Sequence, residues 1–246
     1  MEDSKNVIFG RNPVVEAIKG NREIEKLYVS KTAGGNIAKI IKMARDKNII
    51  VSTADSNTLD KLSDGKSHQG VVAVCSVYKY CEIDDILSFA KAKNEKPFLL
   101  LLDGITDTHN LGAIIRTAEA FGVHGIIIPR RRAAGVNSTV VKTSAGATEY
   151  VKIAKVSNIN IAIKKLKEEG IWIVGSSIDS KTDFDKADYT LPIAIVIGSE
   201  GEGMAELTQK NCDFIVKIPM TGHINSLNAS VAASLIMFEV VRQRNK

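Results

Sequence analysis

Apolar and polar positions divide the chain into two regions with independent patterns. The first, residues 7–78, has short apolar runs between turn-forming residues, together with one longer stretch at helical spacing over Ile37–Lys47. This mixture predicts a small α/β unit. Its expected strands are Leu27–Val29, Ile49–Val51 and Val71–Val77, and its expected helices are 12–19, 37–47 and 56–62, with Asn12-Pro13 opening the first.

From Phe98 onward, apolar runs too short for helices alternate with longer amphipathic stretches. Strands are expected at Phe98–Leu102, Gly125–Ile128, Ile171–Gly175, Ile193–Ile197 and Ile215–Ile218. Helices are expected at Leu111–Phe121, Ile159–Glu169, Met204–Asn211 and Asn228–Arg242. The alternation predicts a mostly parallel sheet with helices on both faces. We therefore predict an N-terminal domain over 1–78, a charged linker over 79–97 that contains a helix at Ile86–Ala92 and ends at Pro97, and a larger α/β domain over 98–246.

Two strand-like runs end abruptly in small polar residues. Gly198-Ser199-Glu200-Gly201-Glu202-Gly203 follows the run at 193–197, and residues 219–228 follow the run at 215–218. Parallel strands deliver such loops to a ligand-binding crevice at their carboxyl ends. The loops match neither a phosphate-binding loop nor the dinucleotide fingerprint. They predict one pocket that is built mostly from backbone.

These two loops, with residues 101–118, resemble the three signature motifs of the SpoU/TrmH branch of the SPOUT methyltransferases. The resemblance implies transfer of a methyl group from S-adenosyl-L-methionine to a ribose 2′-hydroxyl of RNA. It also implies a deep trefoil knot from about Ile193 to the C-terminus. SPOUT enzymes are usually homodimers with the active site at the interface, and the apolar C-terminal helix is the expected dimer element.

The beginning of the chain fits one subgroup. Ile8–Ala17 and His68–Ala73 resemble the N-terminal RNA-binding domain of the 23S rRNA (guanosine-2′-O-)-methyltransferases. The resemblance therefore makes 23S rRNA the expected partner. A tRNA substrate is the alternative, as is a non-catalytic role in ribosome assembly. A nicotinamide dehydrogenase is disfavoured because the fingerprint is missing.

The resemblance also assigns residues to the site. It places the cofactor on main-chain atoms of Gly198, Ile218 and Leu227, and we predict further cofactor contacts at Gly203, Met220 and Ser226. The expected catalytic residues are Asn110, Arg116, Glu200, Ser226 and Asn228. A simpler interpretation makes Asn225, Ser226 or Asn228 an N-cap of the last helix, and capping is compatible with binding.

Arg116 lies among Ile114, Ile115 and Ala118, so burial would require it to have a partner or a function. A salt bridge to Glu119 or Glu200 is one interpretation, and contact with RNA and the attacking oxygen is the other. A guanidinium keeps its proton at physiological pH. We therefore expect Arg116 to stabilise charge, with a substrate phosphate, His109 or Glu200 as candidate proton acceptors. Many relatives have proline where this chain has Thr108.

The charge and composition of the chain indicate a polyanionic partner. The net charge is +5 with a pI of about 9.0. Arg130-Arg131-Arg132 follows a predicted strand, so phosphate contact is favoured over a merely solvated run. Residues 142–149 resemble a family segment and are expected near the RNA. The N-terminal region has a basic set of its own, Arg11, Lys19, Arg22, Lys26 and Lys31.

Other classes are disfavoured. No apolar run approaches the roughly 20 residues of a membrane span, and the first residues lack the layout of a signal peptide. The protein is expected in the cytoplasm. Cys75, Cys81 and Cys212 have neither disulfide nor zinc spacing, so no metal is expected.

Overall fold

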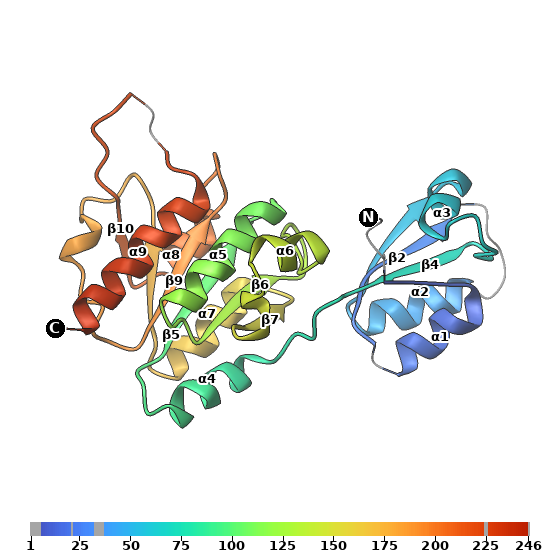
Figure 1. Ribbon diagram of the computed structural model, residues 1–246, viewed down its shortest axis with the longest axis horizontal. Coiled ribbons are helices and arrows are strands. Elements are labelled where there is room, and N and C mark those ends of the chain that lie inside the picture. The colour runs from blue at the N-terminus through green and yellow to red at the C-terminus, as the bar shows by residue number, and fades with distance from the viewer. Residues whose placement is uncertain (1–5, 21, 32–36, 224–225, 246) are drawn as a thin grey trace. The chain divides into compact units, whose positions relative to one another are not determined.

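The computed structural model describes residues 6–20, 22–31, 37–223 and 226–245. The chain forms two compact units, residues 1–79 and 80–246. The ribbon diagram shows the elements of both units (Figure 1). Each unit has its own sheet and its own core, and each is described separately below.

The N-terminal unit is built on a sheet that has the strand order β1-β4-β2-β3 in the described residues. β2 and β3 are parallel, whereas β4 runs antiparallel to both β1 and β2. The strands are β1 (Val7–Phe9), β2 (Ile24–Ser30), β3 (Ile50–Ala54) and β4 (Val71–Cys75), and the helices are α1 (Arg11–Lys19), α2 (Ile37–Asp46) and α3 (Ser56–Leu62).

Helices cover both faces of this sheet to different extents. α1 and α2 pack on the face that carries Leu27 and Val29, where Ile40 of α2 is buried. On the other face, Leu59 of the short α3 packs with Val72. The structure corrects the predicted start of the first helix. α1 begins at Arg11, and its N-cap is Gly10 with a φ of 91°, so Asn12-Pro13 lies inside the first turn.

The C-terminal unit contains a parallel sheet with the order β10-β8-β9-β5-β6-β7 in the described part of the chain. This confirms the expected α/β architecture. Its strands are β5 (Phe98–Asp103), β6 (Gly125–Pro129), β7 (Lys152–Val156), β8 (Trp172–Ser176), β9 (Ile193–Gly198) and β10 (Phe214–Val216). Its helices are α4 (Ile83–Ala92), α5 (Thr108–Ala120), α6 (Ser138–Thr143), α7 (Ile159–Glu168), α8 (Glu206–Lys210) and α9 (Ala229–Arg244), with short 3-10 turns at Ala147–Glu149 and Phe184–Lys186.

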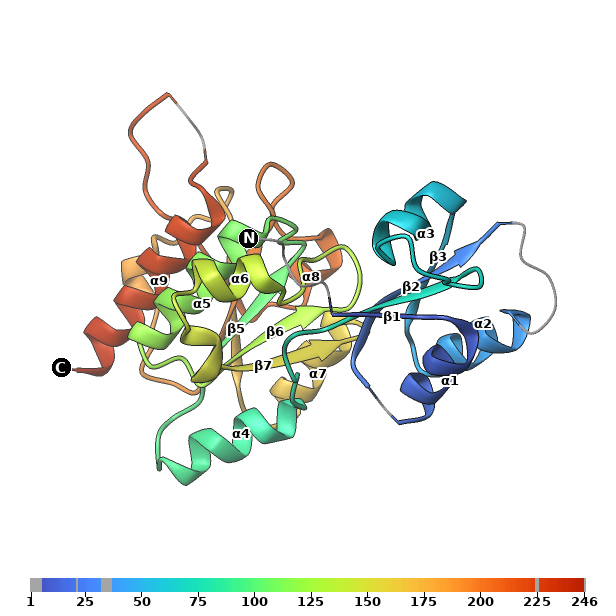
Figure 2. The same cartoon turned by 45° about the vertical axis from the view of Figure 1, so that its right-hand side comes forward.

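The central strands β5 and β9 read as continuous apolar runs because both faces of the sheet are covered. Their residues from 98 to 102 and from 193 to 197 are buried. α4 and α7 pack on one face, where Ile86 and Ile163 belong to the same buried cluster as Leu101. α5 and α9 lie side by side on the opposite face (Figure 2). Both loops predicted to bind a ligand leave the same edge of this sheet.

Three elements were not predicted, for identifiable reasons. β1 spans only three residues, so it shows no period. In β7, Lys152 and Lys155 interrupt the apolar run. Their ammonium groups lie over the rings of Phe89 and Tyr80, 5.4 and 4.6 Å from the ring centroids. α6 has only six residues, and its N-cap Asn137 accepts from the backbone N–H of Val140.

The structure also corrects the predicted linker over 79–97, because residues 80–97 belong to the C-terminal unit. Ile83 and Ile86 of α4 are buried in its core. Ile86 occupies the space that a side chain at Gly125 would fill. Cys81 pairs with Ala154 and so extends the edge of the sheet beyond β7. The charged residues of this segment are simply the outer face of a packed amphipathic helix.

A search of the described helices for one long and apolar enough to cross a membrane finds none.

Candidate active site

The loop after β9 is a tight turn that only glycine permits at its base. Ser199 and Gly203 exchange two backbone hydrogen bonds of 2.9 and 3.0 Å. A Cβ atom on Gly198 would lie 2.2 Å from the carbonyl carbon of Gly203, so the absence of a side chain lets the two ends meet. Asp103, at the end of β5, holds the far end of the loop by accepting from the Ala205 N–H at 2.9 Å.

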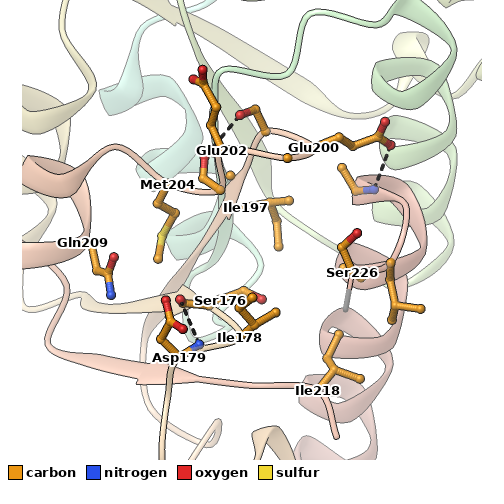
Figure 3. A pocket seen from close by; sticks show the side chains of 18 of the residues that line it. Ser176, Ile178, Asp179, Ile197, Glu200, Glu202, Met204, Gln209, Ile218 and Ser226 are labelled. Carbon is orange, nitrogen blue, oxygen red and sulfur yellow. Dashed lines mark hydrogen bonds between the residues drawn. The ribbon is translucent and has the colours of Figure 1, made fainter. Parts of the chain in front are cut away.

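Beside this loop lies a cavity of about 270 Å³. It is bordered by the segments that follow β8, β9 and β10 and by the start of α9, and Figure 3 shows their side chains around it. Its wall combines apolar side chains such as Ile197 and Ile218, the glycine-rich turn and several polar side chains, as is typical of small-molecule sites. Every residue predicted to touch the cofactor lines this cavity: Gly198, Gly203, Ile218, Met220, Ser226 and Leu227.

Sequence reasoning missed one wall of the cavity. Ser176 at the end of β8, with Ser177 and Asp179 just after it, lines the cavity together with Gln209 of α8. Asp179 and Gln209 lie on the side of the cavity away from Ser226 (Figure 3). The signal was available, because a serine pair directly after a buried parallel strand marks the same edge of the sheet. No motif was recognised there, so the residues were passed over.

Three of the predicted catalytic residues meet next to the cavity. Oε1 of Glu200 accepts from Nδ2 of Asn110 at 3.0 Å, from Nδ2 of Asn228 at 2.6 Å and from the Ala229 N–H at 3.2 Å. Asn228 also donates to Oδ1 of Asn110 at 2.8 Å, which closes the triangle. The network fixes the carboxylate of the β9 loop between the first turns of α5 and α9.

The helix termini explain why these amides point inward. Asp107 is the N-cap of α5 and accepts from the N–H groups of His109 and Asn110, so Asn110 lies in the first turn. Asn228 is the N-cap of α9, where its Oδ1 accepts from the Ser230 N–H at 3.0 Å. Its Nδ2 therefore remains to donate to Glu200. The structure confirms Asn228 as the N-cap, and its amide group also contacts Asn110 and Glu200, so capping is compatible with a role in the site.

The other two candidates at this helix start differ from Asn228. Ser226 borders the cavity and is exposed. Asn225 and Ile224 lie outside the described residues. Asn228 is thus the N-cap, and Ser226 stands two residues earlier with its side chain toward the cavity (Figure 3).

The structure corrects the expected environment of Arg116. Its apolar neighbours Ile114, Ile115 and Ala118 face the core, whereas Arg116 lies on the exposed side of α5. It forms no ion pair with Glu119, Glu200 or any other residue that the structure describes. Seven residues separate it from His109, which is also exposed, so both lie on the same side of the helix. Arg116 is therefore a solvent-facing cation and no part of a structural salt bridge.

The predicted basic run follows β6 at the same edge of the sheet. Arg131 and Arg132 are exposed, and Arg132 has a positive φ of 56°. The Ala134 N–H donates to the carbonyl of Ile105 at 2.7 Å, which holds this segment against the loop after β5. The expected segment 142–149 is nearby, since a Cβ atom at Gly112 of α5 would lie 2.6 Å from Thr143.

No cluster of three or more His, Cys, Asp or Glu side chains in the described ranges could hold a metal ion. Burial raises the pKa of Cys75 and Cys81 and raises that of Cys212 to about 12, which favours the neutral thiol over the nucleophilic thiolate. The site thus offers oriented amides, one carboxylate, hydroxyls and nearby cations.

A parallel α/β sheet with a backbone-lined cavity and a polar network at its carboxyl edge defines a ligand-binding enzyme fold. Comparison with known proteins identifies the family. Residues 97–238 match the model described as the SpoU rRNA Methylase family. Residues 7–81 match the model described as RNA 2′-O ribose methyltransferase substrate binding. The chain belongs to the SpoU family of RNA methyltransferases.

Full-length relatives agree. The chain is 45% identical over 246 residues to YacO of Bacillus subtilis, which is provisionally named a TrmH family tRNA/rRNA methyltransferase, with 100% of this chain and 98% of that protein covered. A Staphylococcus saprophyticus protein with the same provisional family name is 46% identical over 240 residues, covering 97% and 96%.

Solved structures agree as well. The SpoU methyltransferase AviRb of Streptomyces viridochromogenes, in complex with the cofactor AdoMet, has a TM-score of 0.62 and 26% identity, with 97% of this chain and 90% of that chain covered. A TrmH/SpoU tRNA modifying enzyme of A. aeolicus has a TM-score of 0.57 and 29% identity, but its match covers 66% of this chain and 83% of that one.

Proposed function

We propose that this protein methylates a ribose 2′-hydroxyl of RNA with S-adenosylmethionine as methyl donor. The observation that carries the proposal is the Glu200–Asn110–Asn228 network beside the backbone-lined cavity, in a chain of the SpoU family. The matched description of residues 7–81 supports the ribose 2′-oxygen as the acceptor.

The cavity suits this cofactor in size and lining. Its volume of about 270 Å³ is close to the ~300 Å³ at which small-molecule sites begin. Ile197, Ile218 and Leu227 offer an apolar surface to a purine, while Ser226 and the backbone of the β9 loop offer hydrogen bonds. When bound, the cofactor supplies an electrophilic methyl group on a sulfonium. The ribose oxygen would form the new O–C bond as the C–S bond breaks, leaving a neutral thioether, and the hydroxyl proton would pass to a basic group such as a substrate phosphate.

The residues around the cavity have mostly positioning and electrostatic roles. We propose that Glu200, held by three donors on one oxygen, fixes the cofactor loop against α5 and α9. Asn110 and Ser226 orient the ribose. Arg116, which is exposed and keeps its proton, stabilises the developing alkoxide and the adjacent phosphate.

We propose 23S rRNA as the substrate. The tRNA modifying enzyme of A. aeolicus matches 66% of this chain, whereas this chain also has residues 7–81, which match the substrate-binding model. An added RNA-binding unit fits a large folded RNA better than a compact one. A tRNA substrate is the second candidate, because the relatives carry tRNA/rRNA names. Mapping ribose methylations in the rRNA and tRNA of cells with and without the gene tests this. Loss of one rRNA site is expected, and loss of a tRNA site alone would overturn the choice.

We also propose a homodimer formed through α9. Val231, Leu235 and Phe238 are 47%, 37% and 54% exposed, and their spacing places them along one side of that helix. Phe121 of α5 lies beside Phe238 with ring centroids 6.2 Å apart. An exposed apolar stripe of this kind marks a contact surface. The mass in solution tests the proposal, and a monomer at micromolar concentration would contradict it.

The remaining family features are proposals of the same kind. We propose that the chain from about Ile193 is threaded as a trefoil knot, which would hold the loops after β9 and β10 in place. We propose that the N-terminal unit binds substrate RNA and the C-terminal unit performs catalysis. The protein would then act in the cytoplasm, where rRNA is assembled into ribosomes.

A further inference from the structure

One end of the N-terminal sheet resembles a ligand-binding edge in its own right. β1, β2 and β3 all end there, since β1 and β2 both run antiparallel to β4. The loop that precedes β4 closes this edge, because the Ser30 N–H donates to the Gly70 carbonyl at 2.9 Å and the Gly10 N–H to the Val71 carbonyl at 3.0 Å. Ligands of α/β sheets bind outside such strand ends.

Two loops that are distant in sequence are joined at this edge. The Arg11 N–H donates to Oε1 of Gln69 at 3.1 Å, and Nε of Arg11 donates to the Gln69 carbonyl at 3.2 Å. Gln69 has a positive φ of 51°, which is strained for a residue with a side chain. His68 supports the turn, since its Nδ1 accepts from the Gly70 N–H at 3.0 Å and its Nε2 lies 3.2 Å from Asp60.

The arrangement leaves a guanidinium with its binding edge open. Nε of Arg11 is committed to Gln69, so the side chain is oriented rather than free to rotate. Nη1 and Nη2 have no partner among the residues that the structure describes. An oriented fork with two open N–H-bearing nitrogens matches the two oxygens of a phosphate.

Two positions before Arg11 lies an aromatic residue, Phe9, whose ring already contacts a lysine. Phe9 is half-buried, and the ammonium of Lys66 lies over its ring at 6.0 Å from the centroid. A ring with a lysine over its face can exchange that cation for a nucleobase, while the lysine moves to the phosphate. Asp60 does not oppose this, because its carboxylate is engaged by His68 and Ser56.

We propose that Phe9, Arg11, Lys66 and Gln69 form a binding site for single-stranded RNA, with a phosphate on Arg11 and Lys66 and a base on Phe9. The site rests on the proposed function in that RNA is the substrate, and it gives the N-terminal unit a defined contact point. The site includes Arg11 but not every residue of the basic set predicted for the N-terminal region. Lys19 and Arg22 lie elsewhere, bonded to Glu16 at 2.8 Å and to Asn6 at 2.7 Å.

The test compares full-length variants in their affinity for a fluorescent single-stranded oligouridylate and for a 23S rRNA transcript. Lys66→Ala and Arg11→Lys are the test variants, and Phe9→Leu removes the ring while keeping an apolar side chain. Lys39→Ala is the matched control, because Lys39 is an exposed lysine on α2, which packs on the other face of the sheet. Thermal unfolding verifies that each variant is folded.

We expect Kd for both RNAs to rise roughly five- to tenfold in each test variant. The slope of log K against log salt concentration should fall by about one for Lys66→Ala, which removes a charge, and stay nearly unchanged for Arg11→Lys, which keeps the charge and loses only the two-nitrogen fork. Lys39→Ala should change Kd less than about twofold. Affinity for S-adenosylmethionine should stay unchanged throughout. Because the Lys66 side chain holds no hydrogen bond in the described structure, its variant tests the site even if Arg11→Lys disturbs the turn.

Equal RNA affinity of Lys66→Ala and Lys39→Ala would overturn the proposed site. That result would leave the proposed function standing if the wild-type chain still methylates RNA. Conversely, a wild-type chain that methylates no RNA would contradict the proposed function, while the binding comparison would still decide the site.

Discussion

At the residue scale, Asn228 shows how one side chain serves both the fold and the site. Its oxygen caps α9, and its amide nitrogen donates to Glu200 and Asn110. These partners are 28 and 118 positions away in sequence, so no local pattern could have predicted the network. The resemblance marked the residues that meet there, but only the fold shows which atoms touch.

The two functions of Asn228 can be separated. Asn228→Ser keeps an oxygen to cap α9, so the free energy of unfolding should change by less than about 1 kcal/mol. It removes the Nδ2 donor, so the Glu200 carboxylate loses its shortest hydrogen bond and the loop is less well positioned. We expect methyl transfer to fall on the order of 10²-fold. Thermal unfolding and single-turnover rates measure both effects, and a serine variant with wild-type turnover would contradict the assigned role.

Arg116 offers a second test because it is exposed and has no ion-pair partner in the part of the chain that the structure describes. Arg116→Ala should leave stability within about 0.5 kcal/mol of wild type, as for ordinary surface changes. Removing one electrostatic stabiliser should lower turnover on the order of 10²-fold with cofactor affinity retained. Lys164→Ala, an exposed change on α7, is the control. Turnover near that of the control would remove Arg116 from the catalytic residues.

At the scale of elements, continuous apolar runs were predictable and short or interrupted elements were not. β5 and β9 are buried on both faces, so every residue from Phe98 to Leu102 is apolar. β7 is not predictable because Lys152 and Lys155, which lie over aromatic rings, interrupt its apolar run. The helix of α4 is predicted at 86–92, but its charges favour a linker, whereas they lie on the outer face of a helix that packs on the core. A local pattern cannot show which charged residues cover a core.

The loop after β9 gives a prediction at this scale. Gly198→Ala places a Cβ atom 2.2 Å from the Gly203 carbonyl carbon, so the turn must open. Affinity for S-adenosylmethionine should fall at least roughly tenfold, because 1.4 kcal/mol of lost contact already has that effect. Gly222→Ala is the matched control, since nothing lies within 4 Å of its added Cβ. Isothermal titration measures both, and equal affinities would argue against a backbone-built pocket.

At the scale of the whole molecule, the boundary between the units determines which truncations fold. A chain of residues 80–246 keeps α4 and the Cys81–Ala154 pairing, so we expect a folded protein that binds cofactor but has lost most rRNA methylation. A chain of residues 98–246 loses Ile83 and Ile86 from the core and should be less stable by several kcal/mol. Circular dichroism and thermal unfolding distinguish them. Equal stability of the two chains would indicate that residues 80–97 are a linker and no part of the C-terminal core.

The central claim is transfer of a methyl group to a ribose 2′-oxygen of RNA by this chain. The direct measurement incubates the purified protein with methyl-labelled S-adenosylmethionine and RNA from cells that lack the gene, followed by alkaline hydrolysis. A methylated 2′-oxygen cannot attack the adjacent phosphate, so the account predicts label in one alkali-resistant dinucleotide from 23S rRNA. Label in mononucleotides, or no label in any RNA, would contradict it.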